Sequence, residues 1–171
     1  IVENAGPGLA VGQVRSSDPD AGDRLTYSLV DSANGRFTID ATTGVVRVAQ
    51  NAGLNFEAQD EHQITVRAVD QGGLASEQTL TITVRDINEA PSQPLIVAGG
   101  DIVENAADGA FVARVTAQDV DAGDTLTYVL VDSAGGRFEI DPITGVITTA
   151  VGAVLDHETN PQHVVRVRAL D

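Results

Sequence analysis

The sequence predicts an all-β protein of two tandem seven-strand Greek-key sandwiches, the second truncated before its last strand. The first observation is an internal repeat, because Ile1-Val2-Glu3-Asn4-Ala5 returns 101 residues later as Ile102-Val103-Glu104-Asn105-Ala106. The second is a series of short segments in which apolar and polar residues alternate, the pattern of half-buried strands. A unit of about 100 residues built from such strands is typical of a Greek-key sandwich and too long for a solenoid repeat.

The predicted strands of the first copy lie between turn residues. Leu25, Tyr27 and Leu29 alternate with polar neighbours, so that one face of that strand is buried. The glycines of Asn34-Gly35 and Thr43-Gly44 supply the positive-φ positions that tight turns need. The strands are predicted over Ile1–Asn4, Leu9–Arg15, Leu25–Val30, Arg36–Ile39, Val45–Val48, His62–Val69 and Glu77–Arg85.

An acidic and proline-bearing segment, Asp86–Pro94, interrupts the strand pattern and is the predicted linker. We therefore expect one domain over residues 1–91, ending in the linker, and a second over residues 92–171. The second copy stops at Asp171, before the counterpart of Glu77–Arg85. We expect residues beyond Asp171 in a longer array to supply that strand, and its lack to cause fraying or association around His163–Leu170.

The composition excludes several classes of partner. Ten Lys and Arg stand against 25 Asp and Glu, a net charge of -15 at pH 7. Nucleic acid is excluded, because phosphate binding needs clustered Lys and Arg. The chain has no Cys, and therefore no disulfide, thiolate metal site or Cys nucleophile. No apolar run reaches the ~20 residues that cross a bilayer, so we expect no direct membrane insertion of this segment.

Acidic residues recur beside glycine in both copies, as in Asp18–Asp23 and Asp119–Asp124. This recurrence favours cation binding over a surface that is acidic only for solubility. Ca2+ takes six to eight oxygen ligands from carboxylates, amide side chains and backbone carbonyls, at about 2.3 to 2.6 Å. An EF-hand loop does not fit, because counting from Asp119 the glycine is fifth and the twelfth residue is Leu130.

Other chemistries find less support in the sequence. His62 and His163 occupy equivalent strand positions, which indicates packing rather than zinc ligation. No Gly-x-Ser-x-Gly elbow or phosphate loop is present, so we expect no enzyme activity. Asp156 and Glu158 could form a glycosidase-like acid pair, but the first copy has Asn55 in place of Asp156.

Five motifs follow one another in a characteristic order. They are a Glu near the first strand, an Asp-x-Asp loop, a Leu-Asp-x-Glu, an Ala-x-Asp and an acidic linker. Their residues are Glu3 and Glu104, Asp18 and Asp20, Asp119 and Asp121, Asp156 and Glu158, Asp70 and Asp171, and Asp86–Pro91. Over essentially the whole chain this order resembles the cadherin repeat family, especially the cadherin-like repeats of large bacterial surface and secreted proteins. The resemblance implies an extracellular or cell-surface location and Ca2+ bound between repeats.

The resemblance also implies a ligand set. The first ion would use Glu3, Glu57, Asp86, the Ile87 carbonyl, Glu89 and Asp121. The second would use Asn88, the Ala90 carbonyl, Asp119, Asp121, Asp171 and a loop carbonyl near Asp124. A third, outermost ion would use Glu3, Asn55, Glu57 and Glu89. The predicted metal-ligating set also includes Asp18, Asp20, Asp70, Glu104, Asp156 and Glu158.

Three residues depart from the family pattern. Asn55 stands where the family favours Asp, which weakens the outermost site. Glu89 replaces an Asp of the linker and adds a methylene, which shifts its carboxylate. Ala90 replaces an Asn that the family uses through its carbonyl, so this change is tolerated. We expect two ions at the junction, with a third weakened.

The expected function is that of a calcium-binding adhesion module. Without ions the junction carboxylates repel, at roughly 1 to 3 kcal/mol for each pair about 5 Å apart, so Ca2+ would convert a hinge into a stiff rod. The expected partners are other cadherin-like repeats or an extracellular polysaccharide. The alternatives are a calcium-dependent carbohydrate-binding module and a passive spacer. The lack of Trp disfavours both a sugar-binding platform and the Trp-anchored strand exchange of vertebrate cadherins.

Overall fold

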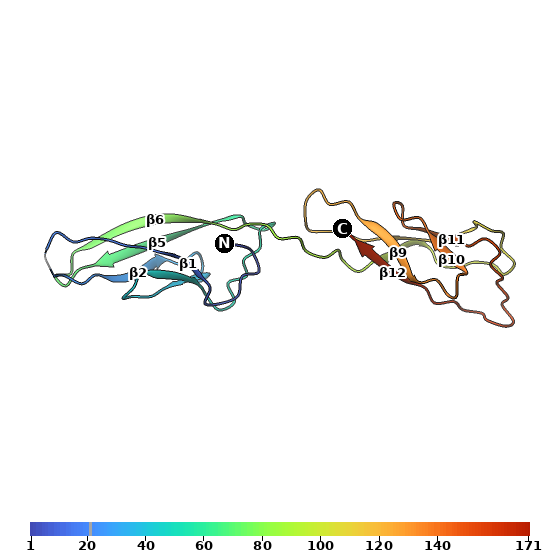
Figure 1. The fold of residues 1–171 in the computed structure, drawn as a ribbon, viewed down its shortest axis with the longest axis horizontal. Helices are drawn as coiled ribbons and strands as arrows, with labels where there is room; N and C mark the ends of the chain where they lie inside the picture. The colour runs from blue at the N-terminus through green and yellow to red at the C-terminus, as the bar shows by residue number, and fades with distance from the viewer. Residues whose placement is uncertain (21) are drawn as a thin grey trace. The chain divides into compact units, whose positions relative to one another are not determined.

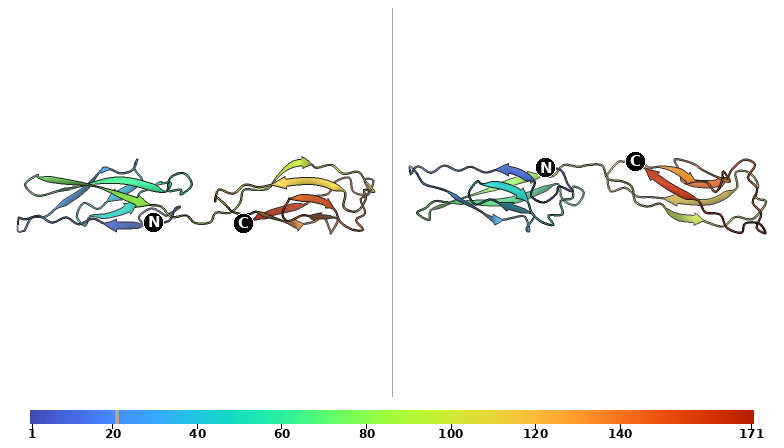
Figure 2. Two further views of the ribbon diagram at one scale, coloured as in Figure 1. Left: turned by 90° about the horizontal axis from the view of Figure 1, so that it is seen from above. Right: turned by 60° about the horizontal axis from the view of Figure 1, so that its bottom comes forward.

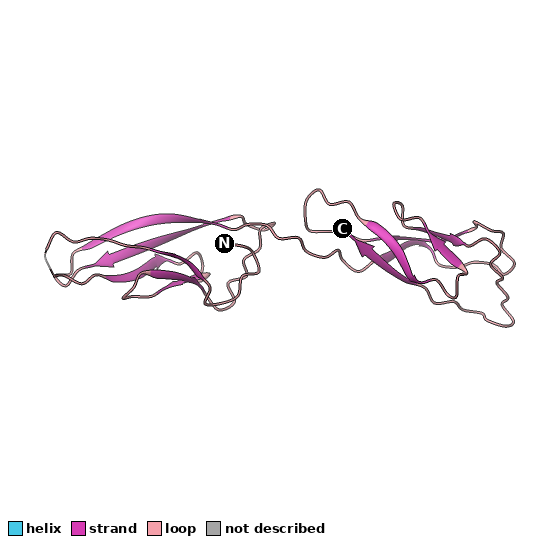
Figure 3. Ribbon diagram, in the orientation of Figure 1, coloured by secondary structure: helices cyan, strands magenta, loops and turns pink. Residues whose placement is uncertain are grey.

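The computed structural model describes residues 1–20 and 22–171, so Ala21 of the repeated Asp18–Asp23 loop lies outside the described residues. The chain divides into two compact units, Ile1–Ile87 and Asn88–Asp171. Figure 3 shows strands and loops in both. Throughout the part of the chain that is described, no helix has the length and apolarity needed to cross a membrane.

Unit 1 is a sandwich of two antiparallel sheets (Figure 1). Its strands are β1 (Ala10–Gln13), β2 (Thr26–Asp31), β3 (Phe37–Ile39), β4 (Val45–Val48), β5 (Glu61–Val69) and β6 (Ala75–Thr83). One sheet has the order β1-β4-β3 and the other β2-β5-β6. Each of these strands lies within two residues of its predicted ends, which confirms the sandwich prediction for this copy.

The predicted first strand, Ile1–Asn4, is reduced to an isolated parallel bridge between Val2 and Arg85. Arg85 N–H donates to the Ile1 carbonyl at 2.7 Å, and Glu3 N–H donates to the Arg85 carbonyl at 3.0 Å. Asn4 then turns with a φ of 52°, a left-handed conformation that ends the extended run. The prediction of a full strand was wrong because alternation alone does not reveal where the partner strand ends.

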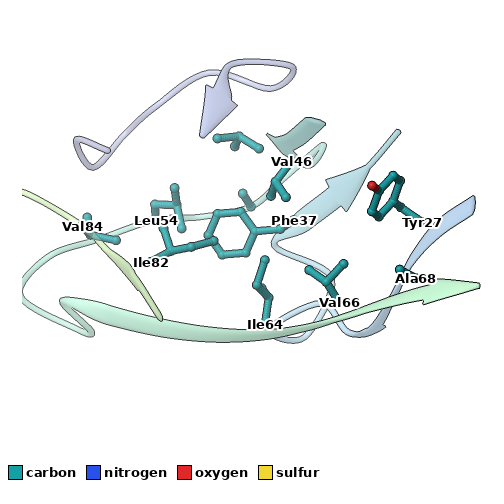
Figure 4. Packing of buried hydrophobic residues seen from close by; sticks show 11 residues of the cluster. Tyr27, Phe37, Val46, Leu54, Ile64, Val66, Ala68, Ile82 and Val84 are labelled. Carbon is teal, nitrogen blue, oxygen red and sulfur yellow. The ribbon is translucent and has the colours of Figure 1, made fainter. Parts of the chain in front are cut away.

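The core of unit 1 is built from the inward residues of both sheets (Figure 4). Phe37 lies at its centre, with Ile64 and Ile82 beside its ring. The ring of Phe37 also contacts His62 edge to face, with 5.9 Å between centroids. Full burial of an aromatic or branched side chain stabilises a fold by about 1.5 to 3 kcal/mol, so this layer supplies much of the driving force of the unit.

The repeated Thr-Gly turn has a structural explanation. In unit 1 the Asp40 carboxylate accepts hydrogen bonds from the Thr42 and Thr43 amides and from the Thr43 hydroxyl. These bonds, those of Thr43 first, hold the pKa of Asp40 below its ordinary value. Gly44 follows with a φ of 68°, and a Cβ there would lie 2.4 Å from the Val14 carbonyl oxygen. Asp40 is therefore a turn residue and not a candidate ligand.

Unit 2 repeats this architecture with differences at both ends. Its strands are β7 (Leu95–Gly99), β8 (Phe111–Thr116), β9 (Thr127–Asp132), β10 (Phe138–Ile140), β11 (Val146–Thr149) and β12 (Arg166–Leu170). One sheet has the order β10-β11-β8-β7, and β9 pairs with β12 in the other (Figure 2). The equivalent ring contact recurs, with the centroids of Phe138 and His163 5.7 Å apart.

Strand β7 was not predicted from the sequence; it pairs antiparallel with β8 from Leu95↔Thr116 to Gly99↔Ala113. Its counterpart in unit 1 would precede Ile1, so the repeat could not reveal it. Its apolar residues Leu95–Val97 are also contiguous and exposed rather than alternating. The counterpart of the predicted first strand, Ile102–Asn105, is not a strand, since the segment equivalent to Arg85 is not part of the chain.

Candidate metal-binding sites

Among the described residues, acidic side chains gather in groups whose members each offer a carboxylate oxygen within 4.8 Å of the others. Unit 1 holds Glu3, Glu57 and Asp86 in one group and Asp18, Asp23 and Asp70 in another. Unit 2 holds Asp119, Asp121 and Asp124 in one group and Glu104, Asp156 and Glu158 in another. In each unit, one group lies next to the segment that connects the two units along the chain.

The group around Glu3 is built on a buried carboxylate. Glu3 is only 1% exposed, because the bridge between Val2 and Arg85 holds its backbone against the sandwich. Its Oε2 accepts a hydrogen bond from Phe56 N–H and its Oε1 accepts one from Ile87 N–H, both at 3.0 Å. Each oxygen keeps a further lone pair, and Glu57 and Asp86 add exposed carboxylates nearby. The group offers clustered hard oxygen ligands, the kind that Ca2+ prefers.

Asn55, a predicted ligand of the outermost ion, has a turn-capping role. Its Oδ1 accepts a hydrogen bond from Ala58 N–H at 2.6 Å. The equivalent Asp156 of unit 2 does the same through Glu158 and Thr159, and the hydrogen bonds from Thr159, then Glu158, hold the pKa of Asp156 low. Asn and Asp serve equally in this capping role, so the turn survives the departure from the family pattern.

In unit 2, the group of Asp119, Asp121 and Asp124 contains carboxylate oxygens that lack a hydrogen-bond donor. Asp121 Oδ2 accepts a hydrogen bond from Glu89 N–H at 2.7 Å, and Asp119 Oδ1 accepts one from Asp121 N–H at 3.1 Å. The remaining oxygens, Asp119 Oδ2 and Asp121 Oδ1, are buried without a hydrogen-bond donor among the described residues. A buried anionic oxygen without a partner is costly, and a bound cation would remove that cost.

The neighbouring residues of unit 2 add to the negative charge. Burial raises the pKa of Asp124, and so do the carboxylates of Asp121, Asp119 and Asp171, in that order. Asn88 donates a hydrogen bond from its side-chain amide to Asp171 Oδ2. The structure thus brings together, within unit 2, the side chains that the family resemblance implied for the second ion. Ala90, assigned through its carbonyl, lies exposed two residues after Asn88.

Comparison with known proteins places the chain in a family. The model of the cadherin domain matches residues 1–85 and again residues 100–171. The chain belongs to the cadherin family. Cadherin repeats are non-enzymatic extracellular adhesion domains that typically bind Ca2+ at acidic sites between domains. The family match therefore agrees with the fold, the location and the lack of enzyme activity expected from the sequence.

Relatives of this cadherin segment include animal proteins. Mouse cadherin EGF LAG seven-pass G-type receptor 1 is 37% identical, and the alignment covers 100% of this chain and 6% of that protein. Human cadherin-22 is 35% identical, with 100% of this chain and 22% of that protein covered. The crystal structure of mouse cadherin-23 EC22-24 is 28% identical with a TM-score of 0.64, and covers 99% of this chain and 60% of that one.

The relatives are much longer than this chain. The chain spans only a small part of the length of either full-length relative. Their mouse and human origin lends no support to the bacterial source expected from the sequence.

The second acidic group of the first cadherin repeat, which lies at the end of the unit away from the linker, differs from its prediction in one residue. Asp18, Asp23 and Asp70 come together, whereas Asp20 is not in the group and uses its amide to donate to Asp18 Oδ1 at 2.8 Å. Asp23 was missed, although its equivalence to the predicted Asp124 could have revealed it. The group lies at the turn end of the β5–β6 hairpin, because Val69 pairs with Ala75 there. Asp86 follows the opposite end, about 27 Å away along the strand.

The second acidic group of the second cadherin repeat, formed by Glu104, Asp156 and Glu158, is exposed. Glu104 Oε2 accepts a hydrogen bond from His157 N–H at 3.0 Å, which is the counterpart of the bond from Phe56 to Glu3. Glu104 is nevertheless exposed where Glu3 is buried. The difference follows from the segment after β6, since in the first cadherin repeat the Arg85 carbonyl accepts a hydrogen bond from Glu3 N–H and Ile87 N–H donates one to the Glu3 carboxylate.

Proposed function

We propose that this segment binds Ca2+ through the two acidic groups next to its linker, and that the bound ions restrain the two repeats relative to each other. The observation that carries the proposal is the pair of buried carboxylate oxygens without donors, Asp119 Oδ2 and Asp121 Oδ1.

Oxygen ligands are available in sufficient number and of suitable type. Glu3, Glu57 and Asp86 supply carboxylates in the first repeat, and Asp119 and Asp121 supply them in the second. Linker residues up to 91 add further carboxylate, amide and carbonyl oxygens, so ligands for either repeat come from one short stretch of chain. Six to eight such oxygens complete the coordination of a Ca2+ ion. We propose two ions there, with a third, outermost ion bound weakly because Asn55 replaces a carboxylate.

The proposed mechanism is electrostatic. Without ions, the carboxylates that converge on the linker repel one another by roughly 1 to 3 kcal/mol for each close pair, which favours an open hinge. Bound Ca2+ would replace this repulsion by attraction of the carboxylates to a shared cation, and so restrain each repeat relative to the next. In a longer protein such a segment would serve adhesion by holding distant binding surfaces at a defined separation. We propose other cadherin repeats as its partners.

The alternative of a carbohydrate-binding module gains little from the structure. Tyr27 and Tyr128 are buried, and each hydroxyl accepts a hydrogen bond, from Ser16 N–H and from Ala117 N–H. These rings therefore pack in the cores and offer no face for sugar stacking. The adhesion proposal is favoured for that reason.

Calorimetric titration with Ca2+ tests the ligand assignment. Asp121→Asn should weaken Ca2+ binding at least tenfold, because it removes a charge that two ions share. Asp31→Asn is the matched control, since Asp31 is exposed and its Oδ1 accepts only a local bond from Ala33 N–H. Equal losses in the two variants would show diffuse attraction of cations in place of a site.

Small-angle scattering tests the mechanical part of the proposal. Extracellular calcium modules bind with dissociation constants of about 10⁻⁴ to 10⁻³ M, so millimolar Ca2+ should act. We expect the spread of conformations to narrow on going from EDTA to excess Ca2+, and the melting temperature to rise. If Ca2+ binds but leaves both the scattering curve and the melting curve unchanged, the ions do not restrain the linker.

A further inference from the structure

A polar hollow of about 180 Å³ lies in unit 1, between the turn that joins β2 to β3 and the start of β5. Its polar lining residues are Asp31, Asn34, Arg36, Gln59, His62 and Gln63. None of them belongs to the acidic groups that the proposed calcium function uses. A space with such walls accepts a polar occupant in preference to an apolar one.

Two residues of the hollow carry a buried nitrogen atom without a hydrogen-bond partner among the described residues. These atoms are Nε of Arg36 and Nε2 of His62. The His62 side chain is only 3% exposed, and its ring is held edge to face against Phe37. A buried polar atom without a partner is costly. An occupant that bonds to both atoms gains free energy at little desolvation cost, because folding has already removed water from them.

The guanidinium group of Arg36 keeps one edge for an occupant. Its Nη1 donates to the Ala33 carbonyl oxygen at 3.3 Å, which fixes the other side of the group. The remaining edge, formed by Nε–H and Nη2–H, makes no hydrogen bond within the described part of the chain. Two parallel N–H groups of this kind match the two oxygens of a planar carboxylate.

The charge of the hollow also favours an anion. Arg36 has no ion-pair partner among the described residues, and Asp31 uses its Oδ1 to accept a hydrogen bond from Ala33 N–H at 2.8 Å. Burial first, and the charge of Arg36 second, lower the pKa of His62. The positive charge of Arg36 therefore reaches the imidazole without being neutralised nearby. A neutral imidazole with its proton on Nε2 is a further donor to an anion.

Three side-chain amides complete the hollow. Gln59 donates from its Nε2 to the Glu61 carbonyl oxygen at 2.7 Å. The amides of Asn34 and Gln63 are exposed and have no hydrogen bond among the described residues. They are free to donate to an occupant at the opening.

The equivalent place in unit 2 lacks these features. Arg137, at the position of Arg36, uses its Nε to donate to the Val154 carbonyl oxygen at 3.4 Å. Gly135 and Val164 replace the two free amides. The fold of the repeat therefore requires neither the unpartnered guanidinium edge nor the amides at the opening. They are a property of the first repeat alone.

We propose that the hollow of unit 1 binds a single carboxylate group, from a free anion or from an acidic side chain of a partner protein. Nε–H and Nη2–H of Arg36 donate to its two oxygens, and Nε2–H of His62 donates to one of them. The amides of Asn34 and Gln63 border the opening. The site does not depend on the proposed calcium function.

Titration of the 171-residue chain with sodium acetate, followed by NMR at neutral pH and constant ionic strength, tests the proposal. The signals of Arg36 Nε–H and of the His62 ring should shift and saturate. The Arg137 Nε–H signal is the internal reference and should stay in place. A second probe, N-acetylglutamic acid α-amide, presents its carboxylate as a protein side chain does. Tighter binding of this probe identifies a partner side chain as the source, and tighter binding of acetate identifies a free anion.

Two variants and one control separate a site from general attraction of anions. Arg36→Gln should weaken acetate binding about tenfold or more, because it removes the charged hydrogen bonds. Arg47→Gln is the matched control, since Arg47 is exposed and donates to the Gly8 carbonyl oxygen at 2.9 Å. The Asn34→Gly/Gln63→Val variant carries the residues that unit 2 has at these positions, so it should fold and bind severalfold more weakly. Shifts that never saturate, shifts that are equal in both units, or unchanged affinity of Arg36→Gln would overturn the proposal.

Discussion

Truncating one valine in each repeat should give unequal costs, although the two residues occupy the same place in the fold. Val66 is 2% exposed in the closed core of unit 1, and Val167 is its half-buried counterpart, which lines an open groove of about 940 Å³ in unit 2. Val66→Ala removes two methyl groups at about 0.8 kcal/mol each and leaves an unrelaxed cavity, a total of about 2 to 3 kcal/mol. Val167→Ala leaves a space that opens into the groove, so we expect about 1 kcal/mol.

Native-state hydrogen exchange in increasing urea measures both costs in one chain, because each unit reports its own unfolding free energy. In thermal unfolding the same values correspond to about 10 to 20 °C for Val66→Ala and about 4 to 8 °C for Val167→Ala. Equal losses within about 0.5 kcal/mol would refute the reasoning, since the groove would then be closed in solution.

Three further outcomes are expected. His62 is buried, and its pKa is lowered by burial first and by the charge of Arg36 second, so the unfolded state binds more protons than the folded state. The stability of unit 1 should therefore fall as the pH drops below about 6.5 and level off below the pKa of the folded state. Melting temperatures at pH 7.5 and 5.5 measure this loss, and the His62→Gln variant, which cannot titrate at this position, should lack it. Gly145→Ala should destabilise unit 2 by about 1 to 3 kcal/mol in urea, because φ is +66° and a Cβ would lie 2.4 Å from the Val115 carbonyl oxygen, with Gly136→Ala, whose Cβ meets nothing, losing less. Asn55→Asp should strengthen the weakest Ca2+ step in calorimetry, whereas an unchanged isotherm would place Asn55 outside the coordination sphere.

Much of the fold is predictable from the sequence because the information is local. Alternation at Leu25, Tyr27 and Leu29 locates β2, and the Thr-Gly turns locate the ends of β3 and β4. β7 escaped prediction because edge strands carry little alternation and this one has no earlier copy for comparison. The extent of an edge strand depends on its partner, which a linear pattern does not contain.

The candidate sites were predictable as residue types but less so as geometry. The repeat and the family resemblance together named nearly all the acids that the structure groups together. They did not separate Asp20 from Asp23, since both lie in one loop and only the fold decides which carboxylate points to Asp70. They also gave no sign that Glu3 is buried, because burial there depends on backbone donors that are 53 and 84 residues away in sequence.

The bridge at the start of unit 1 has a mechanical meaning. Ile1–Glu3 and Arg85 lie side by side in parallel, so tension that pulls Ile1 and Ile87 in opposite directions loads their hydrogen bonds in shear. Bonds loaded in shear share the force and must rupture together, whereas bonds loaded end to end open one by one. The Glu3 carboxylate joins this clamp through Ile87 N–H. A ligand held by Glu3 would therefore change the force at which the unit yields as well as the temperature at which it melts.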